Sequence, residues 1–500
     1  MSLSNLELPA FLKSGNKAHL IPVVKDSNKE VRATSSVLAV MLAVPDFGKA
    51  ILDYIGAPIT KRSRLKCFTE VVFKDSASND KPDGLIIVES GASSWSAIIE
   101  AKVGNNKLDQ EQIERYLDIA KANNIDALVT ISNQLAVLPT FHPVEISKQK
   151  TRNVGLYHVS WKCITTEALR LINSNPKLVV DPAQEFVLAE LIWYLENDRD
   201  VYVPFNRMPA SWKDICMSFQ QSLPVSRSPQ TREIVESWHQ LARYLALKMS
   251  IAVNTPVTVN LTKAQKADKE TFINDCLSNL VENGKLKAEF VIPDAASRIR
   301  FKADLKTRTL SASMKIEAPG DRVQAKSSIN WLFKQIDKCE DKDNDISIIA
   351  FWPGKVPQTH ATLGELREDR KVLLSGLTSQ PPTAFTVRRI VDLAGKFSGV
   401  SILVEKADNL LPDFYEDIGQ HLQAWKPSPP QVVASAEELI DNTPKKEKEA
   451  EHGVTLPSVI ISPPDAPVIS NQILQNNANA ISDNISLNTS KNESEGSPDQ

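Results

Sequence analysis

Residues 82–102 read PDGLIIVESGASSWSAIIEAK, two apolar runs that each adjoin a charged residue. Both runs are short, rich in strand-forming residues and bounded by turn formers, which predicts two adjacent strands. Asp83 opens the first strand, and Glu100 and Lys102 end the second. Because side chains alternate across a strand, Glu100 and Lys102 share one face, and a first strand lying alongside would bring Asp83 up to Glu100.

Carboxylates that meet at strand ends predict a metal site with a cation beside it. Two facing carboxylates repel each other and are costly to bury. A hard divalent cation such as Mg²⁺ requires carboxylate oxygens at roughly 2.1 Å and would relieve that repulsion. An ordinary meander would make Asp83 a turn residue and Glu100 and Lys102 an ion pair, but it does not explain why a charged pair ends so apolar a strand.

Pro82-Asp83 and Glu100-Ala101-Lys102 together resemble the motif of the PD-(D/E)xK nuclease superfamily, which has the restriction-endonuclease-like fold. The resemblance covers about residues 30–170. The E-x-K tripeptide alone is a weak signal, since Glu340-Asp341-Lys342 also matches it. That second copy lies in a polar stretch with no strand leading into it, and we interpret it as a solvated loop.

The surrounding pattern indicates an α/β domain with a mixed sheet flanked by helices, as the resemblance also implies. Apolar residues at helical spacing after Lys102 predict a helix whose buried stripe packs on the sheet. Helices are expected at 30–44, 109–123 and 165–172, and strands at 67–73, 84–88, 95–99, 127–131 and 155–161.

The residue types and the resemblance imply a metal-dependent hydrolase of phosphodiester bonds. Asp83, Glu100 and the backbone carbonyl of Ala101 would hold Mg²⁺, with Mn²⁺ as its substitute. The ion lowers the pKa of a bound water and neutralises charge that builds on the phosphate. Lys102 positions that water or stabilises the developing negative charge.

Two further acids and one amide belong to the resemblance. Many relatives carry a glutamate on a helix before the sheet, where Glu30 stands, and Glu70 competes with it as a further metal ligand, although an exposed glutamate on an edge strand also explains Glu70. Gln112 with Tyr116 matches a Q-x-x-x-Y pattern in which the glutamine points at the catalytic site. If Asp109 caps the helix, Gln112 is instead the N3 residue of a capping box.

One dense basic cluster precedes the strand that contains Glu70, and it consists of Lys61, Arg62, Arg64 and Lys66. Phosphate contacts supply most of the non-specific affinity for nucleic acid, so this cluster is a candidate nucleic-acid-binding segment. A solvated loop explains the same run of charges.

The chain divides into four expected segments. Residues 1–175 form the nuclease-like domain, 176–250 a helical connector, 251–425 a second α/β domain, and 426–500 a disordered acidic tail rich in Pro, Ser and Asn. In the second domain, strands are expected at 288–292, 298–305, 310–316, 346–352, 386–391 and 400–404, and helices at 325–336 and 412–425.

A basic strand face is expected in the second domain, where cations alternate with apolar residues along two strands. The residues are Arg298, Arg300, Lys302, Lys306 and Arg308. Such a face could be a nucleic-acid platform. Without exposed aromatic residues between the cations, we favour an ordinary solvated face.

Composition excludes several classes of protein. Hydrophobic residues make up 42% and charged residues 24% of the 500 residues, an ordinary globular balance, and no segment has the length and apolarity of a membrane span or signal peptide. The five cysteines are scattered, which argues against a disulfide framework or a zinc site and favours the cytoplasm. His158 and His239 lack ligand-spaced partners and are expected to be core or surface histidines.

Two classes of function remain open. The first is a metal-dependent nuclease, with DNA as the expected substrate and bacterial defence or DNA repair as the expected setting. The second is a non-catalytic nucleic-acid- or protein-binding scaffold that retains a nuclease-like fold. A protein partner could bind the second domain or the tail, where 454–461 is an apolar island, and no membrane partner is expected. The intact Asp83, Glu100 and Lys102 favour the first class.

Overall fold

An antiparallel meander continued by parallel strands forms the first sheet of the computed structural model, which describes residues 8–22, 25, 27–74, 80–173, 181–339 and 345–427. The strand order is β1-β2-β3-β4-β5-β6, antiparallel from β1 to β4 and parallel from β4 to β6. The strands are β1 (Leu12–Lys17), β2 (Arg64–Phe73), β3 (Gly84–Ser90), β4 (Ser93–Ala101), β5 (Ala127–Ser132) and β6 (Gly155–Ser160).

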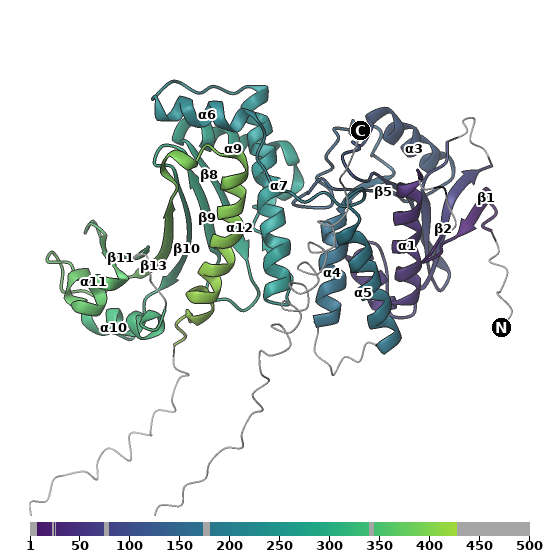
Figure 1. The fold of residues 1–500 in the computed structure, drawn as a ribbon. Coiled ribbons are helices and arrows are strands. Elements are labelled where there is room, and N and C mark those ends of the chain that lie inside the picture. Colours follow the sequence, from purple (N-terminus) through teal and green to yellow (C-terminus); the bar gives the residue numbers. More distant parts are fainter. Residues whose placement is uncertain are drawn as a thin grey trace, which may run out of the picture. The chain divides into compact units, whose positions relative to one another are not determined.

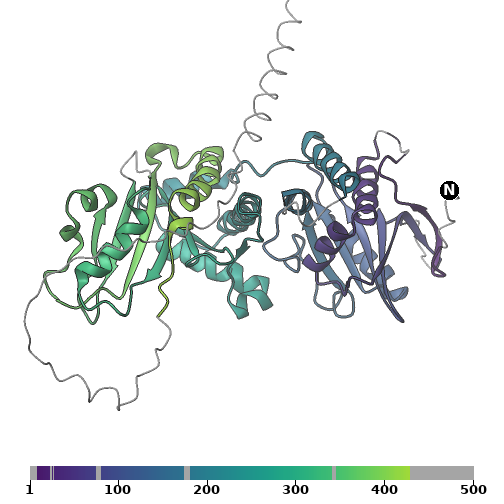
Figure 2. The same cartoon turned by 90° about the horizontal axis from the view of Figure 1, so that it is seen from below.

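Helices cover both faces of this sheet, as expected (Figures 1 and 2). Ile99 and Ala101 belong to the core on one face, together with the first two helices and two later ones. Ile98 belongs to the core on the opposite face, where α3 packs through Ile113 and Leu117. These helices are α1 (Lys29–Ala43), α2 (Pro45–Tyr54), α3 (Gln110–Ala122), α4 (Trp161–Asn173) and α5 (Pro182–Asn197).

A second sheet is wholly antiparallel, with strand order β12-β11-β13-β10-β9-β8-β7. The protein is therefore a mixed α/β protein with two sheets. The strands are β7 (Thr258–Val259), β8 (Lys285–Val291), β9 (Ile299–Asp304), β10 (Thr309–Glu317), β11 (Ile346–Phe351), β12 (Thr359–Thr362) and β13 (Ala384–Asp392).

One core joins the second sheet to its helices, and it includes Trp212, Trp238, Phe272, Ile329 and Leu403. The connector segment divides between the two cores, because α5 packs in the first, α6 packs in the second, and α7 packs mainly in the second while its Leu247 belongs to the first. The helices are α6 (Ser211–Gln220), α7 (Pro229–Ala252), α8 (Lys263–Ala267), α9 (Lys269–Asn283), α10 (Ala325–Ile336), α11 (Leu363–Glu368) and α12 (Val400–Asp417).

The strand expected at 400–404 is wrong, because those residues begin α12. Their β-branched composition favours a strand locally, but buried apolar side chains continue at helical spacing through Phe414. The helix expected at 412–425 therefore starts earlier and ends at Asp417. Pro412 lies inside the helix and provides no N–H for the carbonyl of Asp408, which instead accepts a hydrogen bond from Lys248 Nζ at 3.1 Å.

The expected basic strand face is corrected in part. Lys306 and Arg308 lie in the turn between β9 and β10, and Arg308 has a φ of 57°, so neither belongs to the strand face. His158 and His239 are core histidines, 1% and 8% exposed. The second E-x-K copy at 340–342 lies outside the described residues, as does the tail apart from Lys426 and Pro427.

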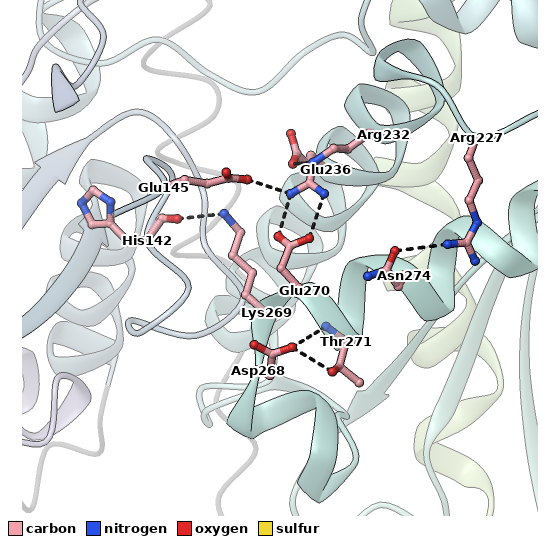
Figure 3. A network of polar contacts seen from close by, with 10 residues as sticks. All are labelled: His142, Glu145, Arg227, Arg232, Glu236, Asp268, Lys269, Glu270, Thr271 and Asn274. Atoms are coloured by element: carbon pink, nitrogen blue, oxygen red, sulfur yellow. Dashed lines mark hydrogen bonds and ion pairs between the residues drawn. The ribbon is translucent and has the colours of Figure 1, made fainter. Parts of the chain in front are cut away.

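A polar network ties the loop between β5 and β6 to α7 and α9 (Figure 3). Arg232 on α7 contacts Glu145 on the loop at 2.9 Å and both carboxylate oxygens of Glu270 at 2.9 and 2.7 Å. Lys269 Nζ donates to the carbonyl oxygen of His142 at 2.9 Å. These charge-assisted bonds join the loop between two strands of the first sheet to helices that pack on the second sheet.

No single helix in the described ranges is both long and apolar enough to cross a membrane. The two helices α1 and α2 meet the length and composition test only as a pair, and the pair is bent by 114°.

Two buried neutral histidines, His142 and His158, should make the protein less stable in acid. Burial lowers the pKa of His142 to about 4 and that of His158 to about 3. A histidine whose pKa is lower in the folded than in the unfolded protein stabilises the fold fully above the unfolded pKa, which is near 6.5. This stabilisation is lost as the pH falls from about 6.5 toward the pKa of the folded protein. For His142 the contribution is at most about 3 kcal/mol.

We therefore expect His142→Gln to lower the free energy of unfolding at pH 7.5 and to flatten its decline between about pH 6.5 and 4. Urea unfolding at several pH values measures both effects. The exposed His421 is the matched control, and His421→Gln should retain the wild-type pH dependence. An equal decline in both variants would contradict the assignment to His142.

Candidate active site

The register of β3 and β4 places Asp83 directly across from Glu100. Gly84 pairs with Ile99 in this antiparallel ladder, so the preceding residue on one strand faces the following residue on the other. Asp83 Oδ2 also accepts a hydrogen bond from the backbone N–H of Ala101 at 2.8 Å. Two residues that are 17 positions apart in sequence are thereby held together by backbone pairing and one side-chain bond.

Glu100 and Lys102 form a partly covered ion pair at the end of β4. The Lys102 Nζ–Glu100 Oε1 distance is 2.5 Å, and the two side chains are 15% and 3% exposed. Ala101 belongs to the core on the α1 side, while Ile98 belongs to the core on the α3 side, so Glu100 lies on the α3 side. Glu100 and Ala101 therefore point to opposite faces, as the alternation of side chains along a strand predicts.

Backbone bonds fix the strand end that carries Lys102. The N–H of Lys102 donates to the carbonyl of Ile131 on β5 at 2.7 Å. Its carbonyl oxygen accepts from Trp161 Nε1 at 2.9 Å. Trp161 is fully buried at the start of α4, so this second bond anchors the strand end in the core.

Burial dominates the electrostatics of the two carboxylates, and at Asp83 the repulsion by Glu100 comes second. Burial and then the negative charge of Glu100 raise the pKa of Asp83 well above its usual range, and the N–H of Ala101 and the charge of Lys102 oppose this only in part. Burial also raises the pKa of Glu100 although Lys102 lowers it. Burial lowers the pKa of Lys102, but the charge and hydrogen bond of Glu100 outweigh burial, so the net shift is upward and the lysine stays protonated.

Glu30 is the acid that joins this charge cluster. Its negative charge raises the pKa of both Asp83 and Glu100, and that of Lys102 as well. Asn106, in the turn after β4, donates to Glu30 Oε1 at 3.0 Å. The start of α1 therefore lies close enough for Glu30 to act on the site electrostatically.

Glu70 is placed differently, although its backbone touches the site strand. Its N–H donates to the carbonyl of Asp83 at 3.1 Å, but its carboxylate accepts a hydrogen bond from Asn16 on β1 at 3.1 Å. Glu70 has a φ of 48°, an uncommon conformation for a residue other than glycine, beside an irregularity in the β1–β2 register. The structure thus favours Glu30 over Glu70 as the further acid of the site.

The donor set fits a magnesium ion that keeps several of its own waters. No group of three or more His, Cys, Asp or Glu side chains that could hold a metal occurs within the described part of the chain. Mg²⁺ is commonly held by only one or two carboxylates, with water and substrate phosphate completing its shell. Asp83, Glu100 and the carbonyl of Ala101 match that requirement, and the excess negative charge between the two carboxylates is what a divalent cation would neutralise.

Gln112 acts as a helix N3 residue through its backbone and contacts Tyr116 through its side chain. Its N–H donates to Oδ1 of the N-cap Asp109 at 2.7 Å. Its side-chain Nε2 donates to the Tyr116 hydroxyl at 3.2 Å. Burial first, and then the charges of Glu100 and Asp83, raise the pKa of Tyr116, so this hydroxyl lies within electrostatic range of the carboxylates. Gln112 therefore binds the N-cap through its backbone N–H and contacts Tyr116, near the site, through its side chain.

The basic cluster lies away from the candidate site. Its residues are Lys61, Arg62, Arg64 and Lys66. Arg64 pairs with Glu89 in the β2–β3 ladder, whereas the site adjoins the other end of that ladder at Thr69 and Gly84. Five residues of strand separate the two ends by roughly 17 Å. Lys66 forms an exposed ion pair with Glu89 at 2.6 Å, which fits a solvated surface better than a part of the site.

Sequence patterns gave no signal for two supporting residues, Trp161 and Asn106. Their contacts join positions that are 59 and 76 residues apart, and neither residue type marks a nuclease site by itself. No family model, curated protein or solved structure matches the chain.

Asp83→Asn should stabilise the metal-free protein at neutral pH. A carboxyl group with a raised folded-state pKa contributes stability that is complete below its unfolded pKa and is lost as the pH rises through the folded pKa. Above that range the ionised pair is destabilising, and asparagine removes one charge while retaining an acceptor for the Ala101 N–H. With chelator at pH 7.5, the melting temperature should rise by roughly 2–4 °C for each kcal/mol of relieved repulsion.

Magnesium should raise the melting temperature of the wild type and leave that of Asp83→Asn unchanged. Glu89→Gln is the matched control, because Glu89 is an exposed strand carboxylate in the same sheet with its own lysine partner. A lower melting temperature of Asp83→Asn in chelator at pH 7.5 would show that Asp83 is stabilised by Lys102 more than it is destabilised by Glu100.

Gln112→Glu tests the link from α3 to the site. The new charge is favourable near a helix N-terminus by about 0.3–1 kcal/mol, but here it would also approach Asp83 and Glu100. We expect a lower melting temperature in chelator than for Gln110→Glu, which adds the same charge to the same turn at an exposed position. Equal melting temperatures and equal Mg²⁺ dependence of the two variants would show that Gln112 only caps the helix and does not act on the site.

Proposed function

We propose that the chain is a nuclease that hydrolyses phosphodiester bonds with Mg²⁺ or Mn²⁺. The observation that carries the proposal is the constellation at the end of β3 and β4, where the buried carboxylates of Asp83 and Glu100 repel each other beside the protonated Lys102. An isolated structural ion pair would need only one of the two carboxylates. The second carboxylate leaves a negative charge that a divalent cation compensates.

Each residue has a distinct role in this proposal. Asp83, Glu100 and the carbonyl of Ala101 would hold the ion, which when bound supplies charge neutralisation and activates water. Lys102, kept protonated by Glu100, would stabilise negative charge that develops on the phosphate. Trp161 and the β4–β5 bonds hold the lysine backbone in place, so that its position does not depend on the substrate.

The arrangement of the first sheet supports a restriction-endonuclease-like fold as part of the proposal. An antiparallel meander β2-β3-β4 carries both carboxylates, α3 follows Lys102 after a short turn, and β5 then joins β4 in parallel. Within this fold the resemblance to the PD-(D/E)xK superfamily assigns DNA as the expected substrate, and bacterial defence or DNA repair as the expected setting.

The test is a cleavage assay with purified protein on linear, circular and single-stranded DNA and on RNA, with Mg²⁺ or Mn²⁺ and with a chelator control. Asp83→Ala, Glu100→Ala and Lys102→Ala should each lower the cleavage rate by at least about 10²-fold, because each removes a ligand or the positive charge at the phosphate. Circular dichroism should show that the variants remain folded.

Two kinds of control separate the site from its neighbours. Glu340→Ala and Lys342→Ala alter the second E-x-K copy, and Glu89→Ala removes an exposed carboxylate from the same sheet. All three should cleave at the wild-type rate. Metal-independent cleavage, or equal losses in both sets of variants, would refute the proposed site, and no cleavage of any substrate by the wild type would favour the non-catalytic scaffold.

A further inference from the structure

One face of the second sheet is covered and the other is open among the described elements. The strand residues that belong to the helix-packed core alternate with residues that are exposed or half-buried, as in β10, where Leu310, Ala312, Met314 and Ile316 are buried. The same alternation runs through β8 and β11. Helices α7, α9, α10 and α12 all contribute to that one core, so they lie on the covered side (Figure 1).

Cations dominate the open face. The acids on it are Glu289, Asp304, Glu317 and, at the end of β13, Asp392. Glu289 is shared by two guanidinium groups, at 3.7 Å from Arg298 and 3.2 Å from Arg300. One carboxylate between two arginines leaves a positive balance. The cations whose strand positions point to this face are Lys285, Lys287, Arg300, Lys302, Lys315 and Arg388, and Arg298 lies directly before β9.

Arg388 is a half-buried cation of this face that has no carboxylate partner among the described residues. It lies on β13 in register with Ser313 on β10 and Ser347 on β11. Its Nε donates to Ser347 Oγ at 2.7 Å, and no carboxylate of the described residues forms an ion pair with it. Burial alone lowers its pKa, which is the effect expected of a desolvated cation without an anion. A guanidinium with two flanking hydroxyl groups is suited to bind an anion there.

Neighbouring cations extend this anion site across several strands. Ser313 also pairs with Arg300 on β9, so Arg300 and Arg388 flank the same serine at two strand spacings, roughly 10 Å apart. Lys315 lies over the ring of Phe351 at 4.4 Å, which places a cation beside a half-buried aromatic surface. Glu289, Ser297, Arg298, Arg300 and Lys315 line a hollow of about 300 Å³. A ligand for this face therefore has repeated negative charges rather than one.

We infer that the open sheet face binds the phosphate backbone of a single-stranded nucleic acid, with Arg388 as the central phosphate contact. The choice of nucleic acid rests on the proposed function, which supplies a ligand with regularly repeated charges. A single strand fits because this face presents a sheet with hydroxyl, cationic and aromatic side chains, on which unstacked bases and a backbone can lie. None of the described helices projects from this face to enter a duplex groove.

The experiment measures binding by the full chain carrying Asp83→Asn, in chelator, so that cleavage does not enter. A fluorescent single-stranded DNA, the RNA of the same sequence and duplex DNA are the probes, titrated between about 50 and 200 mM salt. We expect Arg388→Gln to weaken single-strand binding about tenfold and to reduce the slope of log affinity against log salt by about 0.7, the value for one lost phosphate contact.

Matched variants keep the inference open to refutation. Arg370→Gln removes an exposed arginine of the same domain that packs on Phe333 of α10, and it should bind as the wild type does. Lys315→Gln alters an exposed cation on the open face and should weaken binding even if Arg388→Gln proves unstable. Arg388→Lys should restore the salt slope because it restores the charge.

Several outcomes would overturn the inference. They are unchanged binding in both open-face variants, equal loss with Arg370→Gln, tighter binding of duplex than of single strands, and equally effective competition by polyglutamate. Because no cleavage is measured, binding that depends on Arg388 would support this inference even if the candidate active site proved inactive. If Arg388→Gln in the active protein leaves both cleavage and single-strand binding unchanged, this inference is refuted while the proposed function stands.

Discussion

The candidate site depends on one constraint, the antiparallel register that sets Asp83 opposite Glu100. Backbone pairing along β3 and β4 fixes that register, and a slip by one residue would turn every side chain of β3 to the other face. Buried Leu85 and Ile86 belong to different cores, so such a slip would exchange residues between two packed interiors. The packing of the sheet therefore supplies the free energy that holds two like charges together.

Local patterns predicted the elements next to the site because local chemistry determines them. The helix after Lys102 has its N-cap at Asp109, where an aspartate accepts the N3 backbone hydrogen bond, and its end lies within one residue of the predicted end. The same reasoning failed at 400–404, where strand-favouring residues begin α12 because packing against the second sheet decides. Strand β1, polar and containing Gly15, has no apolar alternation and exists through its pairing with β2.

Contacts between residues that are far apart in the sequence could not be predicted from local sequence patterns. Glu30 and Glu70 could each have served as the further acid, and the choice followed only from the position of α1 and from the bond between Glu70 and Asn16. The basic cluster at 61–66 is dense in sequence but lies at the far end of the β2–β3 ladder. Conversely, the residues two positions from Arg388 on β13 are the uncharged Thr386 and Ile390, so only the strand order brings Arg388 near other cations.

Under the two proposals, charges that the protein leaves uncompensated would link the two sheets to one kind of ligand. The buried carboxylates of the first sheet would be neutralised by a cation, and the cations of the second sheet by an anion. The net charge of the whole chain is only −3, so no strong overall field draws a polyanion toward it. Attraction must then come from local patches, whose influence falls off within a Debye length of about 8 Å in physiological salt. A nucleic acid would consequently be held by direct phosphate contacts, and its affinity should depend steeply on salt.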